Sequence, residues 1–228
     1  MDDTDKEFQL QEIRNKVAKC TKCPLYKLAT NPVPGDGNSN SEIVFIGEAP
    51  GFNEDQQGIP FVGRAGKLLE FMLGQIGYKR KDVWIGNIIK HRPPDNRDPL
   101  PAEIDSCKGY LTEQLIIINP LLIVTLGRFS MNYFLPNAKI TTSRGILHKI
   151  NNKNIYPVYH PAAGLRNPKM KSILISDFLK IPEILKNLKN TDIIHDGNSS
   201  DNRNIHLKTT NDISTESKNP NEKQISLF

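Results

Sequence analysis

The sequence contains only three cysteines among 228 residues. An odd and low number of cysteines excludes a disulfide framework and is typical of proteins that work in a reducing compartment. No run approaches the roughly 18 consecutive apolar residues that a membrane-spanning helix needs, and the acidic N-terminal segment MDDTDKEFQ does not resemble a secretory signal. We therefore expect a cytoplasmic protein.

The composition of the chain changes near residue 190. Residues 190–228 are rich in Asn, Ser, Thr, Asp and Lys and show no sustained apolar periodicity, which is typical of disordered segments. This segment holds six acidic and four basic residues, a net charge of −2. Since the whole chain carries +5, residues 1–189 carry a net charge of +7. We expect one folded domain over residues 1–189, with a basic surface that permits, but does not require, an anionic partner.

Short apolar runs alternate with helical patterns in the expected domain. Four runs rich in β-branched or aromatic residues predict buried strands, at residues 43–46, 83–89, 121–126 and 155–159. Helical patterns cover residues 8–18, 65–76, 102–117 and 173–188, with Pro101 suited to a first turn and Pro182 expected to break or kink the last helix. This alternation predicts an α/β fold, in which ligands bind beyond the carboxyl ends of the parallel strands.

Three predicted strands are followed by side chains that suit a ligand site. Glu48 stands in a turn between Gly47 and a Pro-Gly pair, which fits either close approach of a ligand or an ordinary turn with a solvated carboxylate. Asn87 ends the second strand, where a buried amide needs a hydrogen-bond partner from the protein or from a ligand. His160 follows the fourth strand, where it can serve as an electrophile or simply as a bonded polar residue.

Two further segments are open to a functional interpretation. Phe61, in the segment DQQGIPFVGRAG, either packs beneath a loop or forms a platform for a planar ligand such as a base. Arg166 and Lys169, close after His160, are suited to contact a phosphate.

The three cysteines suggest a metal site that lacks one ligand. Cys20 and Cys23 form a C-x2-C pair, a signal for metal or redox use, and Cys107 lies far along the chain. Three thiolates do not complete a four-coordinate site, and His91, 16 residues before Cys107, is a candidate fourth ligand.

The order and spacing of these segments resemble one protein family. The blocks GEAPGFNEDQQGIPFVGRAGKLL, NIIKHRPPDNRDPLPAEIDSCKGYL and HPAAGLRNP are similar to those of the type-4 uracil-DNA glycosylases, over about residues 10–185. The resemblance implies a three-layer αβα fold with a central four-stranded parallel sheet, a 4Fe–4S cluster, and excision of uracil from DNA in base-excision repair.

The resemblance also assigns roles to individual residues. It implies that Glu48, after Gly47, positions or activates the attacking water, and that His160 faces the charge that develops on uracil. It implies that Phe61 stacks on the flipped base and that Asn87 reads its edge. Glu54 matches a position thought to help exclude the methyl group of thymine, while Leu165 and Arg166 are candidates for the residue that enters the duplex gap.

His91 departs from the usual four cysteines of this family. Histidine can ligate an iron–sulfur cluster, so a set of Cys20, Cys23, His91 and Cys107 is expected, with a zinc site or no metal as the alternatives. A related branch that traps uracil-DNA covalently carries an inserted basic loop with a nucleophilic histidine, and this chain has the short PPDNRDPLP there instead. We therefore expect a turnover enzyme, the alternatives being a covalently trapping or merely binding relative and a zinc-dependent nucleic-acid-binding module.

The last five residues resemble the peptide by which bacterial proteins bind the sliding clamp. They are Gln224, Ile225, Ser226, Leu227 and Phe228, with Ile where the motif usually has Leu. A glutamine that forms hydrogen bonds and a Leu-Phe pair that enters an apolar pocket make a plausible anchor. We expect residues 190–223 to be a disordered linker to this peptide at 224–228, on a monomeric, nucleoid-associated enzyme.

Overall fold

The computed structural model describes residues 3–196, with the side chains of residues 4–190. The described residues form one six-stranded sheet in the order β1-β3-β2-β4-β6-β5. The four central strands are parallel, and the short strands at both borders are antiparallel to their neighbours. The strands are β1 Asp36–Gly37, β2 Ile43–Gly47, β3 Trp84–Asn87, β4 Leu122–Leu126, β5 His148–Ile150 and β6 Lys153–Val158.

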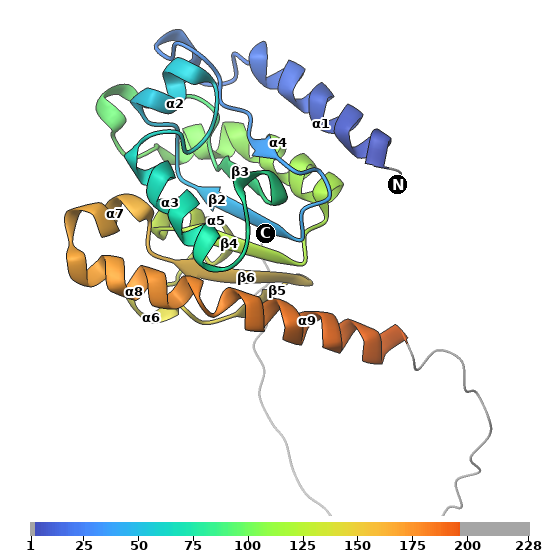
Figure 1. The fold of residues 1–228 in the computed structure, drawn as a ribbon. Coiled ribbons are helices and arrows are strands. Elements are labelled where there is room, and N and C mark those ends of the chain that lie inside the picture. The colour runs from blue at the N-terminus through green and yellow to red at the C-terminus, as the bar shows by residue number, and fades with distance from the viewer. Residues whose placement is uncertain (1–2, 197–228) are drawn as a thin grey trace, which may run out of the picture.

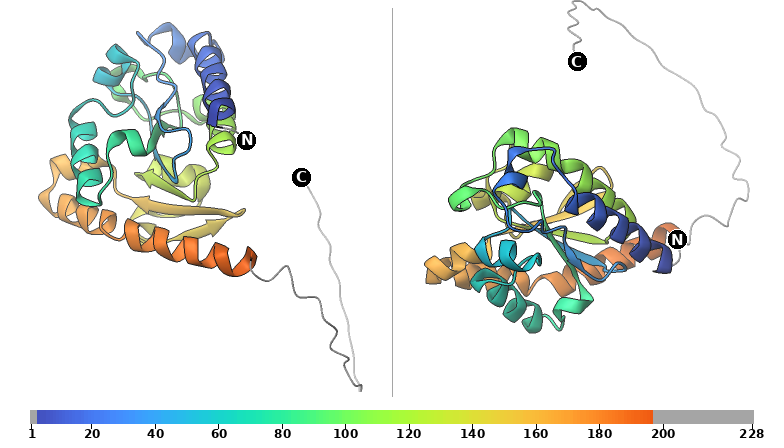
Figure 2. Two further views of the ribbon diagram at one scale, coloured as in Figure 1. Left: turned by 45° about the vertical axis from the view of Figure 1, so that its right-hand side comes forward. Right: turned by 90° about the horizontal axis from the view of Figure 1, so that it is seen from above.

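Helices cover both faces of the sheet, so the molecule has three layers (Figures 1 and 2). Alternate residues of β2 face opposite layers: Val44 and Ile46 pack in the cluster with α1, α4 and α5, whereas Ile43 and Phe45 pack with α3, α8 and α9. The helices of the first layer are α1 Asp3–Ala18, α4 Pro101–Ile118 and α5 Arg128–Phe134. Those of the second layer are α3 Arg64–Gln75, α8 Pro168–Phe178 and α9 Ile181–Asp196.

Shorter helices lie in the connections between these elements. They are α2 Phe52–Gln57, α6 Ile140–Ser143 and α7 Pro161–Arg166, together with the 3₁₀ helices η1 Pro24–Lys27, η2 Arg80–Asp82 and η3 Pro94–Asn96. No helix among residues 3–196 is both long and apolar enough to cross a membrane.

The predicted three-layer α/β fold and its four parallel strands are confirmed, but the sheet is larger than expected. The two border strands, β1 and β5, were missed because runs of two and three half-exposed residues carry no apolar signal. The helix expected over residues 173–188 is two helices, α8 and α9, and Pro182 lies in the first turn of the second. Helix α9 runs to Asp196, so the expected disorder does not begin at residue 190. The peptide 224–228 and most of the linker lie outside the described residues.

Candidate active site

The order of the strands creates a crevice at the carboxyl edge of the sheet. After β2 the chain forms β3 on one side of it and then crosses to form β4 on its other side. Ligands bind at such a switch point, where the order of the strands reverses. A cleft of about 460 Å³ lies there, and its wall includes Glu48 after β2, Gly127 after β4 and His160 after β6. Arg166 of α7 also lines it. Four strand ends that are distant in sequence therefore converge, because Asn87 ends β3 beside them.

Phe61 is held by its backbone rather than by a regular element. Its φ of 53° lies in the left-handed region, which is costly for an aromatic residue and needs support from its surroundings. The Arg80 guanidinium donates to the carbonyl oxygens of Pro60 and Phe61 at 2.5 and 3.2 Å. The Glu54 carboxylate accepts the N–H groups of Val62 and of the next residue at 2.9 and 2.8 Å.

Glu54 therefore holds the loop that carries Phe61, which is a role that its sequence position did not predict. Oε1 of its carboxylate accepts two backbone N–H groups of the loop, and these bonds fix the carboxylate against the loop. The contribution of Glu54 to thymine exclusion stays a prediction.

Asn87 and Phe61 meet directly in front of Gly47. A Cβ added at Gly47 would lie 2.6 Å from Cζ of Phe61 and would collide with Oδ1 of Asn87, so only glycine leaves room at this position. The side chain of Asn87 is 1% exposed, and its Oδ1 is buried without a hydrogen-bond partner. A buried unpaired carbonyl oxygen is costly in a protein that binds nothing there, so Oδ1 of Asn87 is an acceptor available to a ligand.

The ring of His160 is fixed in one tautomer. Its Nδ1 accepts the N–H of Ala162 at 3.1 Å, as the N-cap of α7, so the proton of the neutral ring is on Nε2. The pKa of His160 is lowered to about 4, mainly by burial and further by the charge of the nearby Arg166. The ring also lies 5.7 Å from that of Phe61, centroid to centroid. The histidine is thus a neutral N–H donor near neutral pH.

Glu48 is a half-buried carboxyl in the wall of the cleft. The pKa of Glu48 is raised to about 7, mainly by burial and further by Asp98, against the opposing charge of Arg128. Asp98 and Arg128 form an ion pair with each other, and both line the cleft. The group is therefore poised to exchange a proton near neutral pH, as a general base requires.

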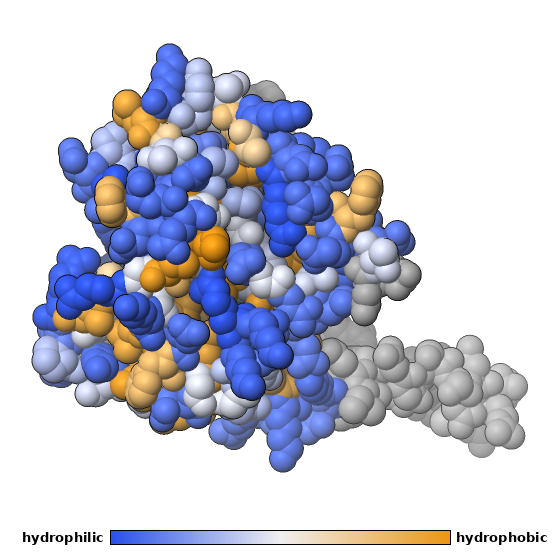
Figure 3. Space-filling view, turned by 45° about the horizontal axis from the view of Figure 1, so that its top comes forward, coloured by the Kyte–Doolittle hydropathy of each residue, from blue (hydrophilic) through white to orange (hydrophobic). Residues whose placement is uncertain are grey.

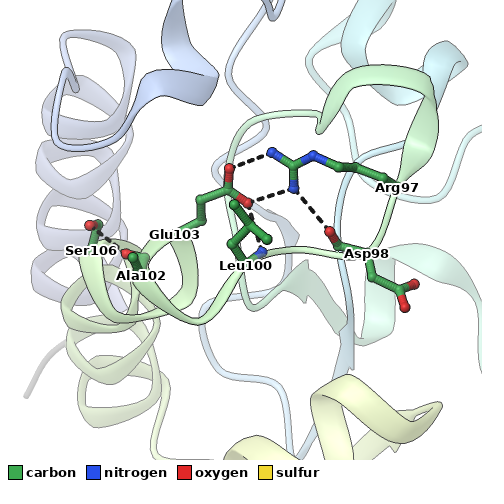
Figure 4. A network of polar contacts seen from close by, with 6 residues as sticks. All are labelled: Arg97, Asp98, Leu100, Ala102, Glu103 and Ser106. Carbon is green, nitrogen blue, oxygen red and sulfur yellow. Dashed lines mark hydrogen bonds and ion pairs between the residues drawn. The ribbon is translucent and has the colours of Figure 1, made fainter.

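A polar network places Asp98 at the cleft (Figure 4). Arg97 binds the carboxylate of Glu103 through both of its terminal nitrogens, at 2.9 and 2.6 Å, and also donates to the carbonyl oxygen of Asp98. Glu103 in turn accepts the N–H of Leu100 at the start of α4. Sequence reasoning missed these residues, although a glutamate two positions after Pro101 is a helix-start signal that could have identified Glu103.

The three thiols lie in one buried cluster between the N-terminal segment and α4. Cys20, Cys23 and Cys107 are free, buried and part of the same core. Burial raises the pKa of Cys107, and the two other thiols add to the rise, while the backbone N–H of Lys90 donates to its sulfur and opposes it. Three thiols that share one core cluster are donors that a thiophilic metal centre prefers.

His91 is not shown with these thiols. Its Nδ1 is buried without a hydrogen-bond partner, and the charged group that acts on its pKa is Asp55, which raises it against the larger lowering by burial. Within residues 3–196, no group of three or more His, Cys, Asp and Glu side chains is arranged to hold a metal ion. The thiols therefore fit the expected group only by their chemistry and not by their arrangement, so the cluster and the participation of His91 both stay predictions.

Lys90 is a buried cation next to these groups that sequence reasoning did not single out. Its side chain is fully buried, and its ammonium donates to the carbonyl oxygen of Asn87 and to Oε1 of Gln114, both at 2.9 Å. The ammonium lies 5.9 Å from the centre of the Trp84 ring. Burial lowers the pKa of Lys90 to about 8, against an opposing effect of Cys107. One residue thus connects Asn87 to α4 and, through its N–H, to a thiol.

The fold and the cleft define an α/β protein whose cleft is lined by a carboxylate and an uncharged imidazole. The aromatic ring of Phe61 and the unpaired amide oxygen of Asn87 do not line the cleft, although the ring of Phe61 lies next to the imidazole. Comparison with known proteins narrows this class. The profile of the Uracil DNA glycosylase superfamily matches residues 34–181, so the chain belongs to that superfamily.

Curated relatives agree with this assignment. The chain is 48% identical to the type-4 uracil-DNA glycosylase of Saccharolobus solfataricus over 186 residues, which are 77% of this chain and 86% of the relative. It is 45% identical to the type-4 uracil-DNA glycosylase of Archaeoglobus fulgidus, over 77% of this chain and 92% of the relative. For the enzyme of that name from Thermotoga maritima, the identity is 41%, over 79% and 97% of the two chains.

Proposed function

We propose that the protein is a monofunctional uracil-DNA glycosylase, which flips uracil out of DNA and hydrolyses its N-glycosidic bond to leave an abasic site. The observation that carries this proposal is the buried, unpaired Oδ1 of Asn87 beside the ring of Phe61. An asparagine amide can accept from N3–H of uracil and donate to its O4, while the ring stacks on the base. Cytosine presents the opposite pattern of donors and acceptors and is therefore rejected.

The remaining groups supply the chemistry. As the bond from C1′ of the sugar to N1 of uracil breaks, its electron pair leaves with the base, and negative charge develops on uracil O2. The Nε2–H of neutral His160 donates to this oxygen. Ionised Glu48 stabilises the cationic sugar and orients the water that attacks C1′, accepting its proton. Arg166, at the rim of the cleft, contacts a DNA phosphate.

An iron–sulfur cluster would be structural in this enzyme. Cys20, Cys23 and Cys107 would hold it, with His91 as the proposed fourth ligand. Bound there, the cluster would fix the N-terminal helix and the segment after Asn87 against α4.

The decisive test is an oligonucleotide with a single uracil. Full-length protein is expected to make the strand cleavable by alkali and to turn over, and Asn87→Ala is expected to slow this reaction. A strand that stays resistant to alkali would refute the proposal. A protein–DNA adduct that survives denaturation without alkali would indicate the covalently trapping alternative, and release of no uracil by a zinc-loaded protein would indicate the binding module.

We also propose that the enzyme acts as a monomer in the cytoplasm at the nucleoid, and that Gln224–Phe228 bind a sliding clamp. Similarity of these five residues to the clamp-binding motif supports the second point. Deletion of residues 224–228 should abolish binding to a bacterial clamp in fluorescence anisotropy and leave excision from short oligonucleotides unchanged. Equal clamp binding by the deletion variant would contradict it.

A further inference from the structure

A second groove lies next to the catalytic cleft, on the other side of α7. It has a volume of about 350 Å³ and is lined by Arg64, Lys67, Leu68, Phe71, Leu165 and Lys171. Helix α7 separates the two hollows, because Leu165 lines this groove and the adjacent Arg166 lines the catalytic cleft. A strand that leaves the catalytic cleft across α7 would therefore enter the groove.

The packing of three helices forms this groove. Helix α7 contacts both α3 and α8, which lie side by side beneath it (Figures 1 and 2). Gly164 allows the close approach, since a Cβ there would lie 3.3 Å from Cα of Lys171 and 3.4 Å from Cδ2 of Leu68. The floor is therefore a rigid part of the fold rather than a loop.

The side chains around the groove carry positive charge without internal partners. Arg64, Lys67 and Lys171 are exposed, and none of them forms an ion pair among the described residues. The carboxylates on the three helices are Glu70, which is exposed, and Asp177, which is buried and paired with Arg144. Arg64 also stands in the first turn of α3, where a cation opposes the helix dipole and gains nothing for stability.

Two large apolar side chains are exposed among these cations. Phe71 is 50% exposed and Leu165 is 38% exposed. Figure 3 shows that one face of the molecule has small apolar patches among hydrophilic side chains. Cations beside an exposed aromatic ring are the composition of surfaces that follow a nucleic-acid strand, whose phosphates take the charges and whose sugars and bases contact the apolar groups.

We infer that this groove, defined by Arg64, Lys67, Phe71, Leu165 and Lys171, binds the backbone of the DNA strand adjacent to the flipped nucleotide. The inference rests on the proposed function, since it assumes that DNA occupies the neighbouring cleft. The groove supplies affinity and register and takes no part in the chemical step. Charge complementarity selects an anionic occupant over an apolar one, and the adjoining cleft, which shares α7 with the groove, makes the DNA strand in that cleft the occupant.

The test compares two variants of the full-length protein with equal changes in charge. The groove variant is Arg64→Gln/Lys67→Gln/Lys171→Gln. The control is Lys81→Gln/Lys149→Gln/Lys186→Gln, which removes three exposed lysines on η2, β5 and α9 that form no ion pair in the described part of the chain. Binding of a uracil-free labelled duplex is measured by anisotropy between 50 and 200 mM salt, and excision is measured in single turnovers at saturating enzyme.

The groove variant is expected to lose about 2 to 3 units of the slope of log K against log salt, since each lost phosphate contact removes about 0.9. The control is expected to keep the wild-type slope, and the saturated rate of excision is expected to be the same for all three proteins. Equal slopes for the groove variant and the control would overturn the inference. A groove variant with a slower saturated rate would overturn it too, because the groove would then serve catalysis.

Substrates of decreasing length supply a second readout. Shortening the oligonucleotide on one side of the uracil should raise KM for the wild type until it equals that of the groove variant, while shortening on the other side should affect both proteins equally. A difference that persists on the shortest substrates of both series would contradict backbone binding in the groove. If the wild type released no uracil at all, the proposed function would fail. The binding measurement on uracil-free duplex would still show whether the groove binds DNA.

Discussion

The carboxyl group of Glu48 illustrates how single residues set the conditions of the reaction. Its environment raises the pKa by burial and by Asp98, and lowers it by Arg128. The sequence predicted Glu48 from its turn after a strand, but not the ion pair beside it. Asp98 and Arg128 are 30 positions apart, and each looks like an ordinary surface charge until the fold brings them together.

The first prediction concerns the pH dependence of excision. Because Glu48 must be ionised, the single-turnover rate should rise with pH with an apparent pKa of about 7. Asp98→Asn should move this profile to lower pH, since it removes a negative charge and frees Arg128, whereas Arg128→Gln should move it to higher pH. Identical profiles for the three proteins would show that Glu48 does not titrate in the reaction.

Stability provides a control for the same group. The pKa of Glu48 in the folded protein lies above its ordinary value of 4.5, so its favourable contribution is complete below pH 4.5 and is lost as the pH rises through about 7. Glu48→Gln should therefore gain stability relative to the wild type between pH 5 and 8, in urea unfolding, while losing excision.

The second prediction concerns the reading of the base. Asn87→Ala removes the acceptor and the donor that face uracil, and should lower kcat/KM for excision by about 10- to 100-fold, or about 1 to 3 kcal/mol. Gly47→Ala should have a comparable effect by displacing Asn87 and Phe61. Circular dichroism and urea unfolding serve as the controls for folding. Wild-type kcat/KM for Asn87→Ala would refute the assigned contact.

At the scale of elements, β3 and α4 are tied together by one buried lysine. The strand was predictable from its apolar run, and the helix from its periodicity and Pro101. The tie between them was not, because a lysine in the segment NIIKH resembles any residue at the end of a strand. Its meaning depends on Gln114, one of the polar residues on the buried face of α4, whose Nε2 also donates to the carbonyl oxygen of Pro34 at 2.7 Å.

The third prediction tests this tie. Lys90→Met should leave the carbonyl of Asn87 and Oε1 of Gln114 unpaired, which lowers the free energy of unfolding by about 1 to 3 kcal/mol for each group. Part of this loss is offset, because the variant no longer buries a charged ammonium. Excision should fall as Asn87 loosens. Gln114→Glu retains an acceptor for Lys90 and should keep more activity. Urea unfolding and single-turnover excision are the measurements, and equal effects of the two variants on excision would count against a positioning role.

At the scale of the whole molecule, the site depends on parts far apart in the chain. The four strand ends were predictable because each follows a recognisable apolar run. The left-handed backbone of Phe61 was not, since it results from contacts with Arg80 and Glu54 rather than from local preference. The thiols are likewise only partly predictable from the sequence. The C-x2-C pair can be recognised there, but its proximity to Cys107 depends on the packing of α1 against α4.

The fourth prediction concerns the metal that would join these parts. Purified protein should contain iron and sulfide rather than zinc, and Cys107→Ser should lose both and unfold at a lower temperature, with α1 more open to proteolysis. His91→Cys should retain the cluster and lower its reduction potential, because histidine ligation raises the potential. Unchanged iron content and potential in both His91→Cys and His91→Ala would exclude His91 as a ligand.

The borders of the sheet have a consequence for how copies of the protein meet. A long, flat strand at a border would offer its free N–H and C=O groups to another chain, which is the usual start of fibrous aggregation. Here β1 has two residues, with Gly37 at a φ of 130°, and β5 has three and leads into two asparagines with positive φ. These interruptions leave little template for strand addition at either border of the sheet, so neither border is suited to recruit a strand from a second copy.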